Sequence, residues 1–392
     1  MTPGPSDGRP LSGVTVVDLT TVVAGPYATL LLSDLGADVV KVEPPQGDPS
    51  RGLGPSVSEG MGAVFLNFNR GKKSVVLDLR TADGRVALKG LVDSADVFVH
   101  NLRSGPAARC GADAGSLKAG HPELVYCAIH GFQADGEHGD RSAYDDIIQA
   151  TSGIAAQQEW LSDAPTYVGT ALADKVSGMA AALAITTALH QRDVTGIGPE
   201  IEVPMADVLT AFGLLEHLWG RTFDPPLGEA RYPRLSSRAR RPYQTSDGWI
   251  SVMVYSDDNW RQFFEILGRP ELVGEQRFAS LNARTAHLEE LFAIVAEAMS
   301  TATTDEWLDR LHAAGIAAGR YNRVDDLFDD EYLADVGFWD RAEHPTEGTL
   351  LQFTTPLLFD GAKPPLGAPA PSLGEHTEQV LDGPSVEPRE MP

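Results

Sequence analysis

The first half of the chain alternates short runs of β-branched and apolar residues with segments of helix-forming residues. Val14–Leu19 is a β-branched run that predicts a strand, and Pro26–Leu35 predicts a helix that Gly36 ends. Further strands are predicted at Val39–Val42, Val75–Leu79, Val97–Val99 and Leu124–Ile129, with helical or turn-like segments at Gly84–Ser94 and Ser116–Gly120. Strands separated by helical segments predict an α/β fold with right-handed crossovers and a mainly parallel, Rossmann-like sheet.

The second half is predominantly helical and is interrupted by a segment rich in proline and arginine. Helices are predicted at Tyr144–Gly153, Asp174–Gln191 and Pro204–Leu218, and the segment Phe223–Arg241 has no steady period and predicts a linker. After it the pattern predicts a strand at Trp249–Tyr255, helices at Asn259–Leu267, Arg284–Met299 and Thr304–Ala314, a helix-like piece at Val324–Asp330 and a closing strand-like run at Leu350–Phe359. The expected organisation is a large domain at 11–222 completed by 333–381, a linker and smaller α+β domain at 223–332, and flexible tails at 1–10 and 382–392.

Composition narrows the classes of partner. The 392 residues include 31 Lys and Arg against 55 Asp and Glu, which gives a net charge of −24. Such an acidic chain is not expected to bind nucleic acid or an anionic membrane surface. The N-terminus has no apolar secretory signal, and the apolar stretch around Met179–Leu189 is too short to span a bilayer. A cytoplasmic globular protein is therefore expected.

Cysteine and histidine give no sign of a metal centre or a disulfide framework. The two cysteines, Cys110 and Cys127, are expected to be reduced thiols. The histidines His130, His138 and His190 are scattered and form no pair on one helical face, so no metal site is predicted.

The first predicted strand–helix turn resembles a dinucleotide site only in outline. Glu43 ends the second strand, where a ribose-binding acid would lie. The turn Thr20–Pro26 contains the single Gly25, however, and Pro26 removes an amide that a phosphate would use. NAD binding is not expected. A tight turn and a turn that admits another ligand to its backbone both remain open.

Asp174 comes directly before the long predicted helix and has two possible roles. It could be an ordinary N-cap residue. Alternatively, the helix N-terminus could hold it as an anion that attacks a thioester carbonyl without a general base. Ser177, Gly178 and Ala181 offer either a groove for a thin substrate or a surface for helix packing.

An ordered set of short motifs identifies the chain as similar to a known family. It comprises Leu11–Val14 with Asp18–Thr20, Ala24–Pro26, Leu35–Glu43, Asn69–Ser74 with Leu77–Leu79, Ala95–Val97 to Asn101–Arg103, Tyr144–Asp145 with Ser152–Gly153, Gly169–Asp174, Pro242–Trp249 and Gly374–Thr377. Over residues 11–380 the chain resembles the class III CoA-transferases, a family that includes formyl-CoA transferase, carnitine CoA-transferase and α-methylacyl-CoA racemase.

The resemblance implies an activity and a set of site residues. Asp174 matches the nucleophile that forms acyl anhydride and aspartyl-CoA thioester intermediates, and Tyr144, Asp145 and Val23 match residues beside it. Residues matching CoA contacts are Val23, Ala24, Leu77, Asp78, Leu79, Arg80, Asn101, Leu102, Arg103, Arg109 and Ser142. The family fold implies an interlocked homodimer. Coenzyme A serves as a substrate, with no permanently bound cofactor and no metal.

Three departures from formyl-CoA transferase bear on the substrate. Val23 replaces a glutamine, Pro44 replaces an arginine, and Ser236–Arg241 stands where that enzyme has a mobile glycine run. Formyl-CoA and oxalate are therefore not expected as the native pair.

Transfer and racemisation require different side chains. Racemisation needs a proton donor and an acceptor on opposite faces of the α-carbon, and the racemases place a histidine where this chain has Tyr144. A phenol is a poor base at neutral pH. The sequence therefore predicts an acyl-CoA:carboxylate CoA-transferase, with a racemase or a non-catalytic acyl-CoA binder as alternatives.

The roles of two groups of basic residues remain open. Lys72 and Lys73 could lie near the adenosine phosphate or in a solvated turn. The arginines between Arg231 and Arg241 could bind an anionic substrate or belong to a linker or subunit contact.

Overall fold

A computed structural model describes residues 8–382 of the chain, which form two compact units. Unit 1 contains the described residues up to Ile154, then Tyr167–Phe212 and the residues from Asp335 onward; unit 2 contains Ala155–Thr166 and Gly213–Ala334. The domain boundaries expected from the sequence remain predictions. Apart from residues 8–10 and Asp382, the expected tails lie outside the described residues.

Unit 1 is built on a six-stranded sheet in which all neighbouring strands are parallel and follow the order β3-β2-β1-β4-β5-β6. The strands are β1 (Thr15–Leu19), β2 (Asp38–Glu43), β3 (Lys72–Val76), β4 (Val97–His100), β5 (Val125–His130) and β6 (Glu200–Pro204). The predicted α/β fold with a mainly parallel sheet is confirmed. The strand order reverses between β1 and β4, and such a switch point is where open α/β sheets bind ligands.

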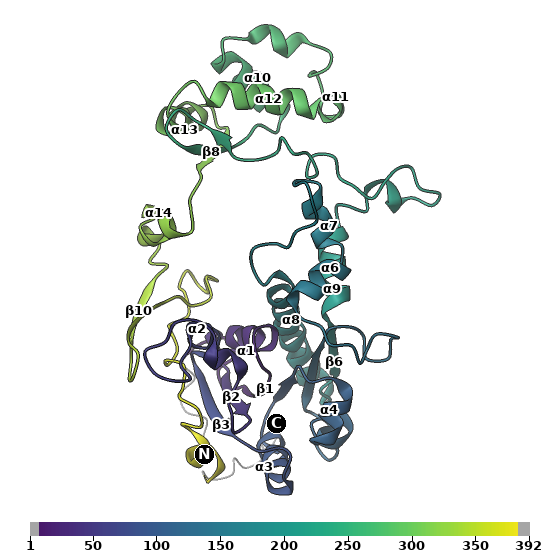
Figure 1. Cartoon of the computed structure of the whole chain (residues 1–392), viewed down its shortest axis with the longest axis vertical. Helices are drawn as coiled ribbons and strands as arrows, with labels where there is room; N and C mark the ends of the chain where they lie inside the picture. The colour runs from purple at the N-terminus through teal and green to yellow at the C-terminus, as the bar shows by residue number, and fades with distance from the viewer. Residues whose placement is uncertain (1–7, 383–392) are drawn as a thin grey trace. The chain divides into compact units, whose positions relative to one another are not determined.

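The two faces of this sheet bury different layers of side chains, because successive residues of a strand point to opposite sides. Val16, Val39 and Val97 share one core with the helices α1 (Ala24–Asp34) and α8 (Leu172–Thr195). Val17, Val40 and Phe98 share the other with α3 (Ala82–Asp93) and α5 (Ala114–Lys118). The helices α1 and α8 pack against each other along the first face (Figure 1).

Among the described helices, α8 alone is long and apolar enough to cross a membrane by length and composition. Its apolar residues Ala181, Ile185 and Leu189 are buried against the sheet and α1. We therefore interpret α8 as the core helix of unit 1.

Several elements of unit 1 differ from the expected boundaries. Strand β3 covers Lys72–Val76 instead of Val75–Leu79, because buried partners satisfy the polar side chains of Lys72 and Ser74 inside the sheet. Leu77–Arg80 consequently lie in the loop that follows β3. Helix α1 begins at Ala24, so Pro26 lies within its first turn, where a missing amide proton costs little. The pattern did not predict β6, α2 (Ala63–Asn69), α4 (Ser104–Arg109) or α7 (Ile154–Glu159).

The remaining elements of unit 1 include the return of the chain from unit 2. Strands β10 (Asp340–His344) and β11 (Gly348–Gln352) form an antiparallel hairpin, so the strand-like run expected at Leu350–Phe359 is shorter and pairs with β10. The other elements are the 3₁₀ helix η1 (Pro49–Gly52) and the helices α6 (Asp145–Thr151), α9 (Met205–Leu214), which runs into unit 2, and α15 (Thr377–Leu381).

Unit 2 has a small antiparallel sheet, β7-β8-β9, packed against helices. Its strands are β7 (Tyr243–Gln244), β8 (Trp249–Met253) and β9 (Ala317–Arg320). Its helices are α10 (Asp257–Ile266), α11 (Leu281–Ala286), α12 (Leu288–Met299), α13 (Thr304–Ala313) and α14 (Glu331–Asp335), with 3₁₀ helices η2 (Trp219–Thr222), η3 (Pro270–Gly274) and η4 (Asp325–Phe328). The helix expected at Arg284–Met299 is divided at His287, whose backbone is not helical.

Candidate active site

The turn between β1 and α1 lies at the carboxyl edge of the sheet and has an unusual backbone. Val22 has φ +71°, a conformation that a β-branched residue rarely adopts and that marks backbone strain. A Cβ on Gly25 would lie 2.3 Å from the Cβ of Thr20, so only glycine fits there. No side chain caps the first turn of α1, which follows Val23. The turn therefore presents an unusual backbone and an uncapped helix start at the switch point between β1 and β4.

Neighbouring side chains hold this turn in place. Asn101, which follows β4, accepts a hydrogen bond from the Thr21 amide (3.0 Å) and donates one to the Thr21 carbonyl (2.9 Å). The Asp48 carboxylate accepts the Val22 amide at 3.2 and 3.3 Å. The predicted site residues Val23, Ala24 and Asn101 are thus brought together, and Asp48 is a supporting residue that the sequence analysis missed.

A buried set of charges, which we call the buried ion network, lies under the turn. It comprises Asp18, Lys41, Glu43, Asp48, Arg51 and Lys72. Lys41 is 2.9 Å from Asp48, and Lys72 is 3.1 Å from Asp18. Burial alone would raise the pKa of Asp18, but Lys72, Lys41 and two hydroxyl groups outweigh it and lower that pKa to about 2. Burial lowers the pKa of Lys72 to about 8 despite Asp18.

The network bears on the open role of Lys72 and on the position of Glu43 at the end of β2. Lys72 is fully buried and cannot reach a phosphate, whereas Lys73 is exposed and pairs with Asp38 at 2.7 Å. Glu43 is also buried, with Arg51 at 2.7 Å and the Ser74 hydroxyl at 2.6 Å. Its carboxylate is already occupied, so it does not face a ribose.

Asp174 lies near the turn, at the start of α8. Both α1 and α8 connect parallel strands and begin at the carboxyl edge of the sheet, so they run in the same direction. Gly178, one turn after Asp174, faces the start of α1: a Cβ there would lie 2.6 Å from the Ala24 carbonyl oxygen. Asp174 therefore lies on the same face of α8, level with the residues that precede Ala24.

Of the two roles left open for Asp174, the structure contradicts that of the N-cap residue. The N-cap residue is Ala171, which has no side-chain cap, and Asp174 is the third residue of the helix. The chain enters α8 through tight backbone bonds at Thr170 and Leu172, which move the helix start ahead of the aspartate. Asp174 is partly buried, and within residues 8–382 no side chain forms an ion pair or a hydrogen bond with its carboxylate. The Asp174 carboxylate therefore does not cap the helix.

The charge state of Asp174 also differs from the expectation. Burial, followed by the negative charge of Asp145, raises the pKa of Asp174 from 3.8 to about 7. The helix N-terminus favours the anion, but burial and the neighbouring acid outweigh it. Ionisation of Asp174 is therefore less favourable at neutral pH than that of an exposed aspartate.

Asp145 and Gln149 shape the surroundings of Asp174. Asp145 Oδ1 accepts the Asp174 amide at 3.1 Å, and its Oδ2 accepts Gln149 Nε2 at 2.6 Å. The fully buried Gln149 also accepts the Val168 amide at 2.9 Å, which ties α6 to the segment that leads into α8. Gln149 was not predicted as a site residue from the sequence. Its spacing of four residues from Asp145 on a predicted helix is the signal that could have indicated it.

The other predicted site residues are mostly exposed. Tyr144 is 71% exposed and precedes α6, and Ser142 is exposed beside it. In the loop after β3, Arg80 pairs with Asp78 through two contacts of 2.8 Å.

The residues after β4 include two exposed arginines. Arg103 donates to the Asp140 carbonyl at 2.8 Å. Arg109, at the end of α4, has no carboxylate partner among the described residues and folds back toward Gly105. Leu102 is half-buried and follows Asn101. These loops follow β3 and β4 at the same edge as the Val22 turn.

Cysteines and histidines contribute no site in the described part of the chain. Cys110 and Cys127 are free thiols, and burial raises the pKa of Cys127 to about 12. Burial also lowers the pKa of His100 to about 3, which keeps it neutral. Within residues 8–382 there is no group of three His, Cys, Asp or Glu side chains suited to a metal ion.

Comparison with known proteins identifies the family. The model of CoA-transferase family III matches residues 11–377. Succinate–glutarate CoA-transferase of Agrobacterium fabrum is 33% identical over 97% of each chain, and human succinyl-CoA:glutarate CoA-transferase is 30% identical over 95% of this chain and 85% of its own. A crystal structure of a CAIB/BAIF family protein from Brucella suis is 33% identical, with a TM-score of 0.78 over 95% of this chain and 99% of that one. The chain belongs to CoA-transferase family III, and it is a CoA-transferase.

Proposed function

We propose that the chain transfers CoA from an acyl-CoA to a carboxylic acid, with Asp174 as the covalent nucleophile. The observation that carries this proposal is the unpaired, partly buried Asp174 carboxylate at the start of α8, beside the uncapped turn at the switch point. A structural carboxylate at such a depth would be expected to have a cation or hydrogen-bond donors. An attacking carboxylate needs its oxygens free.

The reaction proceeds in four balanced steps. The ionised Asp174 attacks the thioester carbonyl, and the C–S bond breaks to release CoA thiolate and leave a mixed anhydride. The thiolate attacks the aspartyl carbonyl, which expels the donor acid as a carboxylate and leaves CoA on Asp174 as a thioester. The acceptor carboxylate attacks this thioester and again releases thiolate. The thiolate then attacks the acceptor carbonyl of the second anhydride, which forms the new acyl-CoA and regenerates Asp174.

The turn and its neighbouring loops supply the binding site for CoA in this proposal. Uncapped amides at the start of α1 suit a developing oxyanion or a pantetheine carbonyl. The exposed Arg80, Arg103 and Arg109 carry positive charge that suits the CoA phosphates. Leu79 and Leu102 are half-buried and offer apolar surface, whereas the side chain of Leu77 is buried in the core. CoA is a substrate in this scheme.

The substrates follow from the relatives by analogy. The named transferases act on succinate, glutarate or mesaconate derivatives, so we infer a short dicarboxylic acid as donor acid, acceptor acid or both. The working form is expected to be a homodimer in the cytoplasm. The net charge of −24 gives no support to nucleic acid or an anionic membrane as a partner.

Chemical trapping tests the covalent step. The protein is incubated with succinyl-CoA and hydroxylamine, and the peptide containing Asp174 is examined by mass spectrometry. We expect an aspartyl hydroxamate that forms only when the acyl-CoA is present. Asp174→Asn should lower turnover by at least about three orders of magnitude. Asp193→Asn, an exposed acid on the same helix, is the matched control and should leave turnover unchanged.

Two outcomes would contradict the proposal. Full turnover by Asp174→Asn would show that Asp174 is not the nucleophile. Deuterium incorporation at the α-carbon of a 2-methylacyl-CoA without an acceptor acid would instead indicate racemisation.

A further inference from the structure

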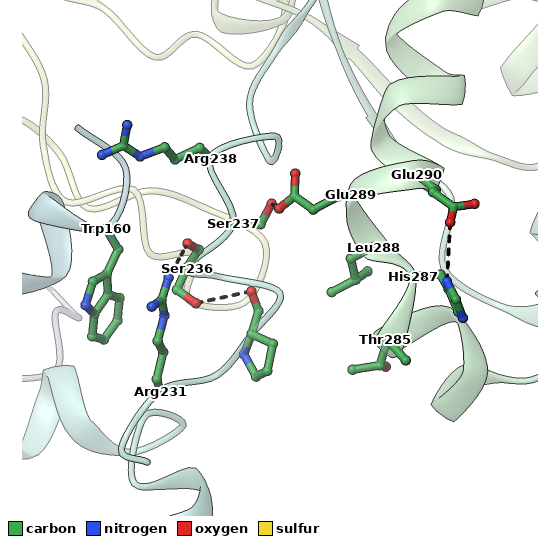
Figure 2. A pocket seen from close by; sticks show the side chains of 12 residues that line it. Trp160, Arg231, Ser236, Ser237, Arg238, Thr285, His287, Leu288, Glu289 and Glu290 are labelled. Carbon is green, nitrogen blue, oxygen red and sulfur yellow. Dashed lines mark hydrogen bonds and ion pairs between the residues drawn. The ribbon is translucent and has the colours of Figure 1, made fainter. Parts of the chain in front are cut away.

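Unit 2 contains a cavity of about 550 Å³ that the proposed chemistry at Asp174 does not use. It lies between the arginine-rich segment after η2 and the helices α11 and α12 (Figure 2). Trp160, Arg231, Ser236 and Arg238 lie on one side, and His287, Glu289 and Glu290 lie on the other.

Arg231 is the available cation of this cavity. Its guanidinium carbon lies 5.4 Å from the centre of the Trp160 ring, and Nη2 donates to the Ser236 carbonyl oxygen at 3.2 Å. Within residues 8–382 no carboxylate forms an ion pair with Arg231. A guanidinium has five N–H donors, so most of them remain available to a ligand. Trp160 is itself fixed by His217, with the ring centres 4.8 Å apart.

The other charges of the cavity are largely occupied. Arg238 pairs with Asp163 at 2.8 Å. Glu290 contacts Arg277 and lies 3.4 Å from His287. Glu289 has no cation partner in the described residues, and its Oε1 accepts the Ser237 hydroxyl at 2.5 Å. The cavity therefore has one cation without an ion-pair partner beside an aromatic ring, and one carboxylate without a cation partner opposite, among the residues that the structure describes.

This charge pattern selects among anions. A phosphate carries up to two negative charges and would place them near Glu289 with only one free cation to balance them. A carboxylate carries one charge, and its two oxygens match two parallel N–H groups of a guanidinium. A short carbon chain can lie against the Trp160 ring.

We propose that the cavity is a subsite for one carboxylate of a short dicarboxylic acid, held by Arg231 against Trp160 and directed away from Glu289. The identity of the acid rests on the proposed function, whereas the binding itself does not depend on CoA transfer. The site would discriminate against multiply charged phosphates through Glu289.

The test measures binding of succinate to the full-length protein without CoA, so no turnover can occur. Calorimetry gives the dissociation constant, and tryptophan fluorescence reports on Trp160, with Trp160→Phe identifying its share of the signal. Arg231→Gln should weaken binding about tenfold or more, because a charge-assisted hydrogen-bonding pair is lost. Arg231→Lys should fall between that variant and the wild type, since it keeps the charge and loses the planar fork.

A variant that is expected to bind succinate more tightly shows that the weaker binding of the other variants does not come from loss of structure. Glu289→Gln keeps the acceptor for Ser237 and removes the negative charge, so succinate should bind more tightly, by about two- to fivefold. Arg221→Gln, an exposed arginine of η2 without an ion pair in the described residues, is the matched control and should bind as the wild type does.

Three results would overturn the subsite. These are no saturable binding of succinate, equal binding by Arg231→Gln, or a Trp160 signal that responds to CoA and not to succinate. Each can occur while Asp174 still traps hydroxylamine, so the subsite and the proposed function fail separately.

Discussion

The buried ion network and the surroundings of Asp174 each remove a carboxylate from solvent, Asp18 completely and Asp174 in part, but they give the two carboxylates neighbours of opposite charge. Asp18 is enclosed by Lys72, Lys41 and two hydroxyl groups, and its pKa falls to about 2. Asp174 has Asp145 as its charged neighbour, and its pKa rises to about 7. Burial acts in the same direction on both groups. The partners decide whether the buried carboxylate is a permanent ion or one that is costly to ionise.

Under the proposed function, this difference separates carboxylates that hold the fold from the one that reacts. The network uses complementary charges to hold the strained Val22 turn, through the Asp48 carboxylate. The Asp174–Asp145 pair has no cation to balance its charge, which fits the role we propose for Asp174 as an attacking carboxylate. A raised pKa distinguishes the proposed nucleophile from Asp18, Glu43, Asp48 and Glu347, the buried acids of unit 1 whose pKa values are lowered by cations or hydrogen-bond donors.

The largest expected effect comes from breaking the network. Asp18→Asn leaves the buried Lys72 without its ion-pair partner, whereas Lys41 keeps Asp48, and it should reduce the free energy of unfolding by about 3–5 kcal/mol at pH 7. Asp174→Asn is the matched comparison and should cost no stability at that pH, because it removes a charge that the fold already disfavours. Chemical denaturation of both variants measures the difference.

The pH dependence of the free energy of unfolding is a second test of the same comparison. The folded pKa of Asp18 lies below its unfolded value, so its contribution to stability is present above about pH 4 and is lost as the pH falls toward 2. The folded pKa of Asp174 lies above its unfolded value, so stability decreases as the pH rises from about 4 to about 7. Equal loss of stability in the two variants would refute the contrast.

A smaller effect is expected from changing the neighbour of Asp174. If only ionised Asp174 attacks, kcat/KM should rise with pH through an apparent pKa near 7. Asp145→Asn removes the like charge and should shift the midpoint of this rise to a lower pH, by about one unit. The shift is limited because burial remains the larger cause of the raised pKa. The pH profile of kcat/KM measures the shift.

An adjacent acid provides the control for this shift. Asp146→Asn changes an exposed residue of the same helix and should leave the profile in place. If the rise of kcat/KM with pH has the same midpoint in Asp145→Asn as in the wild type, Asp145 does not influence the ionisation of Asp174.

The sheet was predictable from the sequence because its evidence is local. Runs such as Val14–Leu19 and Leu124–Ile129 carry the β-branched pattern of buried parallel strands. Edge strand β6 was missed because its alternating Glu and Ile residues form a short and mostly uncovered segment. The boundary of β3 was misplaced because the two lysines at its start resemble a solvated turn, and only long-range partners bury one of them.

The site was only partly predictable for the same physical reason. Asp174 could be singled out by its position at the start of a long helix, but the sequence could not decide between a cap and a free carboxylate. Its pKa depends on burial and then on Asp145, which is distant in sequence. Asp48 was missed because its contact with Val22 crosses 26 positions and gives no local signal. Burial and pairing are properties of the folded chain, so residue type alone cannot supply them.

The smallest expected effect concerns Lys73, the exposed neighbour of Lys72. Successive residues of β3 point to opposite faces, so Lys72 enters the network while Lys73 meets Asp38 near solvent. An exposed ion pair contributes little, and Lys73→Ala should change the free energy of unfolding by about 0.5 kcal/mol or less, with the difference shrinking at high salt. The KM for acyl-CoA should also stay unchanged. A severalfold rise in that KM, suppressed by salt, would place Lys73 beside a CoA phosphate. The contrast between the two lysines would then be one of substrate contact as well as burial.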